Sequence, residues 1–205
     1  SLLDADQPIV QTILRYTAPG SDQRNDLQIE AFSFSPRGGA LNSFAMAAVL
    51  EQTYSTGAVR LESADPHASP VAEQRFLEDE RDLRRLVAGF RDTVAFTKTA
   101  AMREVIAEVT FPDPRRDLSD ESIGDLAVRL AASGYHPCGT ARMGSPGDPA
   151  TVVDQFGRCH AVDGLVVADA SIMPSVPRAN TNLTSIMIGE MIGEWVRTRP
   201  ASYGL

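Results

Sequence analysis

The sequence predicts an α+β fold, in which helices pack on an antiparallel sheet. Strand-like segments bounded by turns fill the first third of the 205 residues, and an amphipathic helical pattern occupies the middle. An apolar helix then closes the sequence. Neighbouring strands joined by short turns pair antiparallel, and an amphipathic helix can cover one face of such a sheet.

Strands are predicted where β-branched and apolar residues lie between turn clusters. The segments PIVQTILRY (8–16) and LQIEAFSFS (27–35) meet this description. The second segment alternates with a period of two, but its phase slips near Ala31. We therefore expect either a bulge at that point or a strand that is buried on both faces.

A loop and a hairpin are expected next along the chain. PRGGALN (36–42) has the composition of a loop, and the segments FAMAAVLEQ (44–52) and GAVRLESA (57–64) flank the residues TYST. Two strand-like runs separated by a short turn predict a β-hairpin, so we expect these two segments to pair.

The middle of the chain predicts one long helix from Glu78 onward. Its apolar residues recur at spacings of three and four: Leu83, Leu86, Val87, Phe90, Val94, Thr97 and Ala101. Its charged residues occupy the other side, which we expect to face away from the sheet: Arg81, Arg84, Arg85 and Asp92.

Two further helices are predicted. Ser119 is expected to cap the first, whose buried edge would consist of Ile123, Leu126 and Leu130. The second should begin near Leu183, after a stretch rich in glycine, proline and aspartate (134–182), with apolar residues at helical spacing.

Composition limits the classes of partner and setting. Asp and Glu total 27 against 19 Lys and Arg, so the net charge of −8 argues against a nucleic-acid surface. No apolar stretch approaches the length of a membrane span, and no signal peptide opens the sequence. The two cysteines, Cys138 and Cys159, are expected to be reduced, no metal site is proposed, and a cytoplasmic location is favoured.

The three histidines differ in their surroundings. His67 lies in a polar loop and His160 in a turn between short strands, so both are expected to be structural or exposed. His136 lies in YHPCGTARMG (135–144), where proline and glycine constrain the backbone. From these residues alone, His136 is either a hydrogen-bonded structural histidine or a general base.

Two other positions near the C-terminus carry chemistry. Asn180 or Asn182 can cap the last helix, while the same helix start can direct free N–H groups at an anion. Asp169 follows an apolar run and can either accept from a ribose or ribityl hydroxyl or cap the turn after it. No GxSxG elbow is present, which argues against a hydrolase, and no GxGxxG segment is present to form a dinucleotide site.

Two segments together resemble the glucose-methanol-choline (GMC) family of flavin-dependent oxidoreductases. They are YHPCGTARMG (135–144) and VVDQFGRCHAVDGLVVADASIMPSVPRANTNLTSIMIGE (152–190). The resemblance is looser over TGAVRLESADPHASP (56–70), which is similar to part of the family's substrate domain. It implies oxidation of a primary or secondary alcohol, with the hydride passing to FAD.

The resemblance also implies roles for individual residues. His136 matches the histidine that accepts the alcohol proton, and Asn180 matches a second active-site position that hydrogen-bonds the substrate oxygen. Two short segments match positions that contact FAD. Asp169 and Ala170 match the segment that lies along the ribityl and diphosphate groups. Thr181 and Asn182 match the segment at the flavin pyrimidine edge.

The family's N-terminal half, with its FAD fingerprint, has no counterpart in this sequence. We therefore expect residues 1–125 to form the substrate-binding core and residues 126–205 to return to the FAD domain. The expected partners are a small alcohol and the missing FAD-domain half. A lyase of the hydroxynitrile type and an isolated non-catalytic domain are the alternatives.

Overall fold

A computed structural model describes residues 10–33, 43–113 and 115–204. The expected loop at 36–42 lies outside these residues. The chain forms two compact units: the first contains Ser1–Ser55 and Arg75–Ala132, and the second contains Thr56–Gln74 and Ser133–Leu205. The class is α+β as predicted, with antiparallel strands in both units and helices that follow them.

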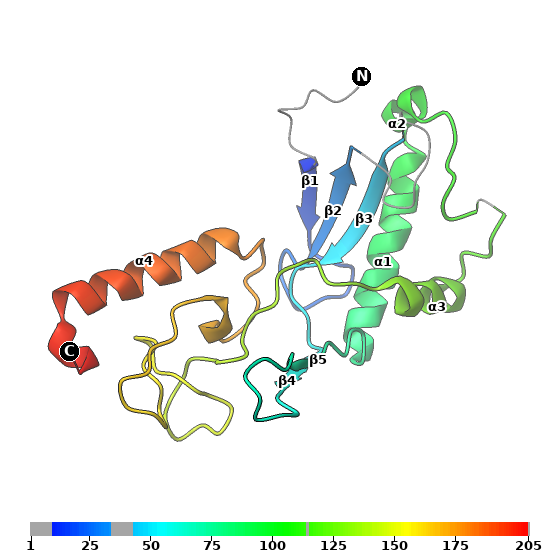
Figure 1. Cartoon of the computed structure of the whole chain (residues 1–205). Helices are drawn as coiled ribbons and strands as arrows, with labels where there is room; N and C mark the ends of the chain where they lie inside the picture. The colour runs from blue at the N-terminus through cyan, green and yellow to red at the C-terminus, as the bar shows by residue number, and fades with distance from the viewer. Residues whose placement is uncertain (1–9, 34–42, 114, 205) are drawn as a thin grey trace. The chain divides into compact units, whose positions relative to one another are not determined.

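The first unit is built on a three-stranded antiparallel sheet in the order β1–β2–β3 (Figure 1). The strands are β1 (Val10–Tyr16), β2 (Leu27–Phe32) and β3 (Ala45–Leu50). The register of β1 against β2 shifts between Val10 and Thr12, opposite Ala31. The expected irregularity is therefore present at Ala31, but the additional residue belongs to the neighbouring strand.

Helix α1 (Glu80–Thr97) packs along β2 and β3 (Figure 1). Leu27 and Ile29 of β2 are buried. A Cβ atom added to Gly89 of α1 would lie 3.2 Å from side-chain atoms of Leu27 and Ala48. The absence of a side chain at Gly89 therefore lets the helix approach the sheet closely.

The predicted hairpin between residues 44–52 and 57–64 is wrong. Strand β3 pairs only with β2 among the described strands, whereas β4 (Ala58–Arg60) pairs with β5 (Val71–Glu73). The backbone N–H groups of Tyr54 and Ser55 donate to the carboxylate of Asp82 in α1, at 2.7 to 3.1 Å. The connecting residues are thus held by the helix instead of closing a turn between two paired strands.

The single long helix predicted from Glu78 is divided in two. α1 ends at Thr97, and α2 (Ala100–Val105) begins after an extended residue, Thr99. The hydroxyls of Thr97 and Thr99 donate to the carbonyls of Val94 and Phe96, at 2.7 and 2.9 Å. Threonine side chains that bond nearby carbonyls compete with helix continuation, which explains the interruption.

Helix α3 (Asp120–Leu130) begins as predicted. The Ser119 side chain accepts from the backbone N–H of Ser122, and Ile123 and Leu126 are buried. Leu130 is 42% exposed, so its assignment to the buried edge was wrong. Helix α3 packs against α1, which completes the first unit.

A buried cluster of three charges joins α1 to the sheet end. The guanidinium of Arg85 lies 2.7 Å from the carboxylate of Asp26 and 2.5 Å from that of Asp82. All three side chains are buried, so the expectation that Arg85 faces solvent was wrong. Burial raises the pKa of Asp26, but hydrogen bonds from Ser21, the Ala18 N–H and Arg85 outweigh it, and the pKa lies below its usual range.

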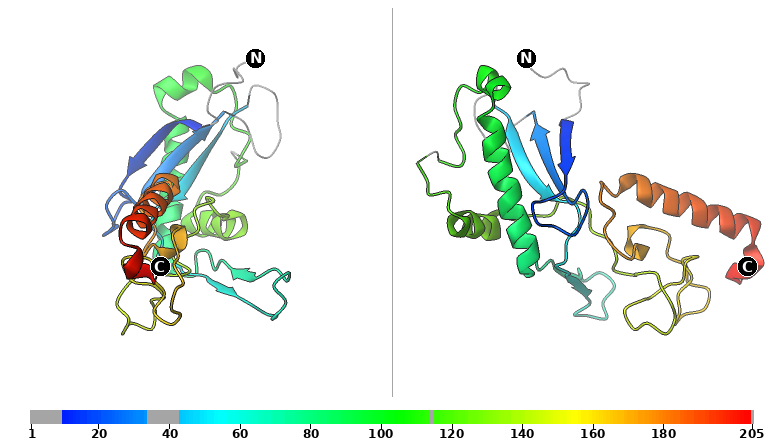
Figure 2. Two further views of the ribbon diagram at one scale, coloured as in Figure 1. Left: turned by 60° about the vertical axis from the view of Figure 1, so that its left-hand side comes forward. Right: turned by 180° about the vertical axis from the view of Figure 1, so that it is seen from behind.

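The second unit contains few regular elements and one apolar core. Helix α4 (Asn182–Thr198) runs beside long loops, followed by the short helix η2 (Pro200–Tyr203), while η1 (Ala170–Ile172) lies within the loops (Figure 2). The core consists of Val153, Ile172, Met173, Ile188 and Ile192. Instead of regular strands, isolated bridges connect the loops, for example Met143 with Val153 and Arg158 with Val166.

Helix α4 begins within one residue of its predicted start. One side of it, with Ile188 and Ile192, contributes to the core. The other side is also apolar but exposed: Leu183 78%, Ile186 53%, Met187 50% and Met191 43%. An apolar stripe on a helix ordinarily packs against another element. This exposed stripe is called the outer face of α4 below.

We expect Arg85→Ala to lower the free energy of unfolding of the first unit by about 3–5 kcal/mol, because it leaves two buried carboxylates without their cation. Urea denaturation measures this loss. Arg84→Ala, which removes an exposed arginine from the same helix, is the matched control and should change stability by less than about 0.5 kcal/mol. Equal effects of the two variants would contradict the role assigned to the buried cluster.

Candidate active site

His136 lies in a loop whose backbone is tied to the segment before α4. The N–H groups of Gly139, Ala141 and Met143 donate to three successive carbonyls, those of Ala170, Ser171 and Ile172, at 2.8 to 3.2 Å. Proline and glycine in the loop exclude regular helix or strand, so these bonds supply the backbone pairing instead. The loop that carries His136 is thereby fixed beside the predicted cofactor segment at Asp169 and Ala170.

The imidazole of His136 contacts two residues at the start of α4. Its Nδ1 atom lies 3.0 Å from Oγ1 of Thr181 and 3.4 Å from the backbone nitrogen of Thr181. Its Nε2 atom lies 2.9 Å from Nδ2 of Asn180. Thr181 is buried, His136 is half-buried and Asn180 is exposed, so the ring is anchored from within and open on its Nε2 side.

The residue before His136 has an uncommon backbone conformation. Tyr135 has φ of 63°, in the left-handed region that L-residues with side chains rarely adopt, and its side chain is 90% exposed. Its N–H donates to the hydroxyl of Ser133 at 2.9 Å. Such conformations cluster at functional sites, where surrounding structure holds them in place.

The start of α4 is capped differently from the prediction. Thr181, and neither Asn180 nor Asn182, is the N-cap residue, and its side chain makes no capping hydrogen bond. The hydroxyl of Thr181 instead faces His136. Because no side chain caps the helix, the first-turn N–H groups from Asn182 onward are left to interact with other groups.

Asp169 is both a turn cap and a remaining acceptor. One of its carboxylate oxygens, Oδ1, accepts from the N–H and the hydroxyl of Ser171, at 2.8 and 2.5 Å. These bonds occupy Oδ1, and the exposed carboxylate keeps the acceptor capacity of Oδ2. The capping and hydroxyl-binding interpretations of Asp169 are therefore compatible in this structure.

Arg142 and Cys138 lie close together in the same loop. Burial raises the pKa of the Cys138 thiol, and the positive charge of Arg142 partly offsets this effect. The Nε atom of Arg142 is buried and has no hydrogen-bond partner among the described residues. Neither cysteine forms a disulfide among the described residues.

The remaining histidines lie apart from these contacts. His160 Nε2 is 3.2 Å from the carbonyl oxygen of Gly144, which fits a structural histidine. His67 lies in an exposed turn. In the described parts of the chain, no group of three or more His, Cys, Asp or Glu side chains could hold a metal ion. Within the same residues, no helix is long and apolar enough to cross a membrane.

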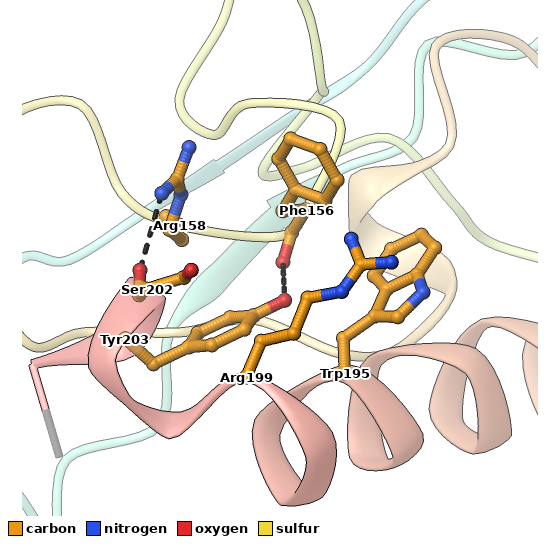
Figure 3. A pocket seen from close by; sticks show the side chains of 6 residues that line it. All are labelled: Phe156, Arg158, Trp195, Arg199, Ser202 and Tyr203. Carbon is orange, nitrogen blue, oxygen red and sulfur yellow. Dashed lines mark hydrogen bonds between the residues drawn. The ribbon is translucent and has the colours of Figure 1, made fainter.

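A small hollow at the far end of α4 contains no catalytic constellation (Figure 3). Trp195 packs edge-on against Phe156, with ring centres 5.3 Å apart. The hydroxyl of Tyr203 donates to the Phe156 carbonyl, and Arg158 donates to the carbonyl of Ser202. These contacts attach the C-terminal turn to the loops, and we assign the hollow a structural role.

The sequence indicated His136 and Asn180 but missed two features. It assigned no contact between the Thr181 hydroxyl and His136, because residues 45 positions apart have no spacing rule that relates them. It also gave no sign of the left-handed backbone at Tyr135, since tyrosine is not enriched there.

Comparisons with known proteins identify relatives over most of the chain. A family model described as GMC oxidoreductase matches residues 53–189. An uncharacterised GMC-type oxidoreductase of Mycobacterium bovis is 40% identical over 153 residues, which is 73% of this chain and 28% of that protein. The 5-(hydroxymethyl)furfural oxidase of Methylovorus sp. is 38% identical over 71% of this chain and 29% of its own length. The oxygen-dependent choline dehydrogenase of Cronobacter sakazakii is 39% identical over 71% of this chain and 25% of its own length.

Solved structures share the fold of this chain over most of its length. Pyridoxine 4-oxidase from Mesorbium loti has a TM-score of 0.81 at 22% identity, over 92% of this chain and 38% of that one. A fungal aryl-alcohol oxidase has a TM-score of 0.67 at 30% identity, over 84% of this chain and 28% of that one. The matched part thus spans 25% to 38% of the length of these relatives.

The thiol of Cys138 provides a probe of the loop's electrostatics. Because its pKa is raised, we expect slow alkylation at neutral pH and a rate that increases as the pH rises above the usual thiol range. Arg142→Gln removes the offsetting charge, so the pKa should rise further and the rate at a fixed pH should fall. Iodoacetamide kinetics in a Cys159→Ser background measure this. A faster reaction in Arg142→Gln would refute the assigned contact.

Proposed function

The chain belongs to the GMC oxidoreductase family, whose members are FAD-dependent, and from this premise we propose that it is the C-terminal part of a flavin-dependent alcohol oxidoreductase. The observation that carries the proposal is the contact between His136 and Asn180. These residues are 44 positions apart in the sequence, and Nε2 of His136 lies 2.9 Å from Nδ2 of Asn180. The basic nitrogen Nε2 of His136 and the amide of Asn180 thus lie next to each other on the exposed side of the imidazole ring.

In the proposed reaction, His136 acts as the general base. Its Nε2 atom takes the hydroxyl proton of a primary or secondary alcohol, since histidine is the side chain most often used as a general base. The amide of Asn180 hydrogen-bonds the same alcohol oxygen and orients it toward Nε2. Bound FAD would supply the acceptor for the hydride of the alcohol carbon. The Pro-Gly loop and its backbone bonds hold the ring in place during the transfer.

The residues of this chain fit a flavin cofactor in two places. At Asp169, the Oδ2 atom can accept from a ribityl or ribose hydroxyl, and the adjacent Ala170 offers no bulky side chain to a diphosphate. At Thr181 and Asn182, the uncapped start of α4 presents N–H groups and the positive end of the helix dipole. These groups would bind the flavin pyrimidine edge, where negative charge increases on reduction.

The main nucleotide site is proposed to lie in a partner portion, the N-terminal FAD-domain half, in the same protein or in a separate chain. The relatives are three to four times longer than the matched part, which supports this proposal. The outer face of α4 supports it as well, because exposed apolar stripes of this kind mark surfaces that another part covers. Residues 1–125 are correspondingly proposed as the substrate-binding core, and 126–205 as the segment that returns to the FAD domain.

The substrate is proposed to be a small alcohol of the kind that the relatives' names indicate. Two curated relatives are named as acting on 5-(hydroxymethyl)furfural and on choline, and a fungal structure is an aryl-alcohol oxidase. All three names denote alcohols, and removal of the hydroxyl proton is the step that we propose for His136 and Asn180. A lyase of the hydroxynitrile type is excluded if an alcohol reduces the flavin of the intact enzyme.

We expect His136→Ala in the full-length enzyme to lower the rate of flavin reduction by alcohol about 10²–10⁴-fold while FAD stays bound, because a positioned base is lost. Anaerobic stopped-flow absorbance measures the rate. His160→Ala, which removes a histidine bonded to a loop carbonyl, is the matched control. An unchanged rate in His136→Ala would remove this residue from the mechanism.

We expect the purified 205-residue chain to retain no stoichiometric FAD and to show no turnover, because it offers contacts only to part of the cofactor. Flavin absorbance after gel filtration tests this. Co-expression with the N-terminal half of a GMC relative is the positive control for cofactor loading. Retention of one FAD per isolated chain would contradict the proposed division of the site.

A further inference from the structure

The two ring nitrogens of His136 have different partners, and this difference bears on which nitrogen carries the proton. Nδ1 faces the buried Thr181, with the hydroxyl at 3.0 Å and the backbone N–H at 3.4 Å. Nε2 faces the exposed Asn180 amide at 2.9 Å. In a neutral imidazole one nitrogen is a donor and the other an acceptor, so the partners select the tautomer.

Two hydrogen-bond networks can form through these contacts: the first uses the hydroxyl of Thr181 and forgoes the bond from its backbone N–H, whereas the second uses both groups. In the first, Nδ1–H donates to the hydroxyl of Thr181, and Nε2 accepts from the Asn180 amide. In the second, Nδ1 accepts from the N–H and the hydroxyl of Thr181, and Nε2–H donates to the amide oxygen of a rotated Asn180. Only the first network leaves Nε2 with the lone pair that a base requires.

The Thr181 hydroxyl is the group that distinguishes the two networks. Asn180 is exposed, and its amide can present either nitrogen or oxygen, so it follows the ring without selecting a tautomer. The backbone N–H of Thr181 can only donate, and it favours an unprotonated Nδ1. The hydroxyl oxygen, at the shorter distance, is the acceptor that Nδ1–H requires.

We propose that Thr181 is a positioning residue that holds the proton of neutral His136 on Nδ1 and so leaves Nε2 free to act as the base. The proposal rests on the proposed function, and it assigns Thr181 a part beyond its backbone contact to the cofactor. When the alcohol proton moves to Nε2, the imidazolium keeps its Nδ1–H bond to the same hydroxyl, so the transfer requires no rearrangement on the buried side.

The location of Thr181 suits this role. It is the N-cap residue of α4, with helical backbone angles of φ −77° and ψ −12°, and its side chain makes no capping bond. It is only 6% exposed, so water does not compete effectively for its hydroxyl. Its orientation is therefore determined by the helix start, independently of substrate.

The test measures the tautomer directly, without flavin or turnover. The chain is labelled with ¹⁵N-histidine, and the protonated nitrogen of neutral His136 is identified from its ¹⁵N chemical shifts at high pH. The chain has only three histidines, so His67 and His160 serve as internal controls. We expect His136 to be protonated mainly on Nδ1.

Three variants make the test specific. Thr181→Val removes the hydroxyl but keeps the shape and the backbone N–H, and it should shift the ratio toward the Nε2–H form about threefold to tenfold, the range one neutral hydrogen bond supplies. Thr181→Ser should restore the original ratio. Asn180→Ala should leave it unchanged, because the hydroxyl is still present.

The proposal is overturned if neutral His136 is protonated on Nε2 in the unaltered chain, or if Thr181→Val leaves the ratio unchanged. It is also overturned if Asn180→Ala shifts the ratio as strongly as Thr181→Val. If the Thr181→Val substitution disturbs the fold of the second unit, the His160 signal changes as well. In that case the Thr181→Ser variant and the rates of flavin reduction in the full-length enzyme test the role of the Thr181 hydroxyl. There Thr181→Val should slow reduction about threefold to tenfold and Thr181→Ser should not.

Failure of the proposed function gives a different result. If the intact enzyme does not oxidise alcohols, no alcohol reduces the flavin of the unaltered protein, whatever the tautomer of His136. If only the role of Thr181 fails, alcohol still reduces the flavin and His136→Ala still slows that reduction, while the ¹⁵N spectra show no dependence on the Thr181 hydroxyl.

Discussion

Three backbone hydrogen bonds organise the second unit around His136. They run from Gly139, Ala141 and Met143 to three successive carbonyls at residues 170–172, and they join two loops that have no regular structure of their own. A loop-rich unit must still satisfy its buried amides, and here the same bonds that do so also place His136 against the start of α4. The contacts to Thr181 and Asn180 depend on this pairing.

The local features of the fold were predictable from sequence because they depend on neighbours in the chain. Ser119 caps α3 through a hydrogen bond three residues away, and α4 begins where the Gly- and Pro-rich stretch ends. The strands β1 and β2 are located by their apolar and β-branched residues and by the turn between them. In each case the deciding interaction spans a few residues, which sequence patterns record well.

The failures have a common physical origin in long-range polar contacts. Asp82 binds the backbone of Tyr54 and Ser55 and so removes the hairpin that composition suggested. Arg85 lies on the charged side of a helical wheel, yet it is buried because the carboxylate of Asp26, 59 residues away, and that of Asp82 on the same helix neutralise it. For the candidate site, motif order indicated His136 and Asn180, whereas the Thr181 hydroxyl could be found only once the chain was folded.

The outer face of α4 has a consequence for the histidine that lies at the helix start. Thr181 is both the N-cap residue of α4 and the hydrogen-bond partner of His136. When the first turn of the helix frays, the histidine therefore loses this hydrogen bond as well. A part that covers the exposed Leu183 and Ile186 would oppose fraying and thereby order the imidazole from a distance. Binding of that part and ordering of the His136 imidazole are then thermodynamically linked, so each makes the other more favourable.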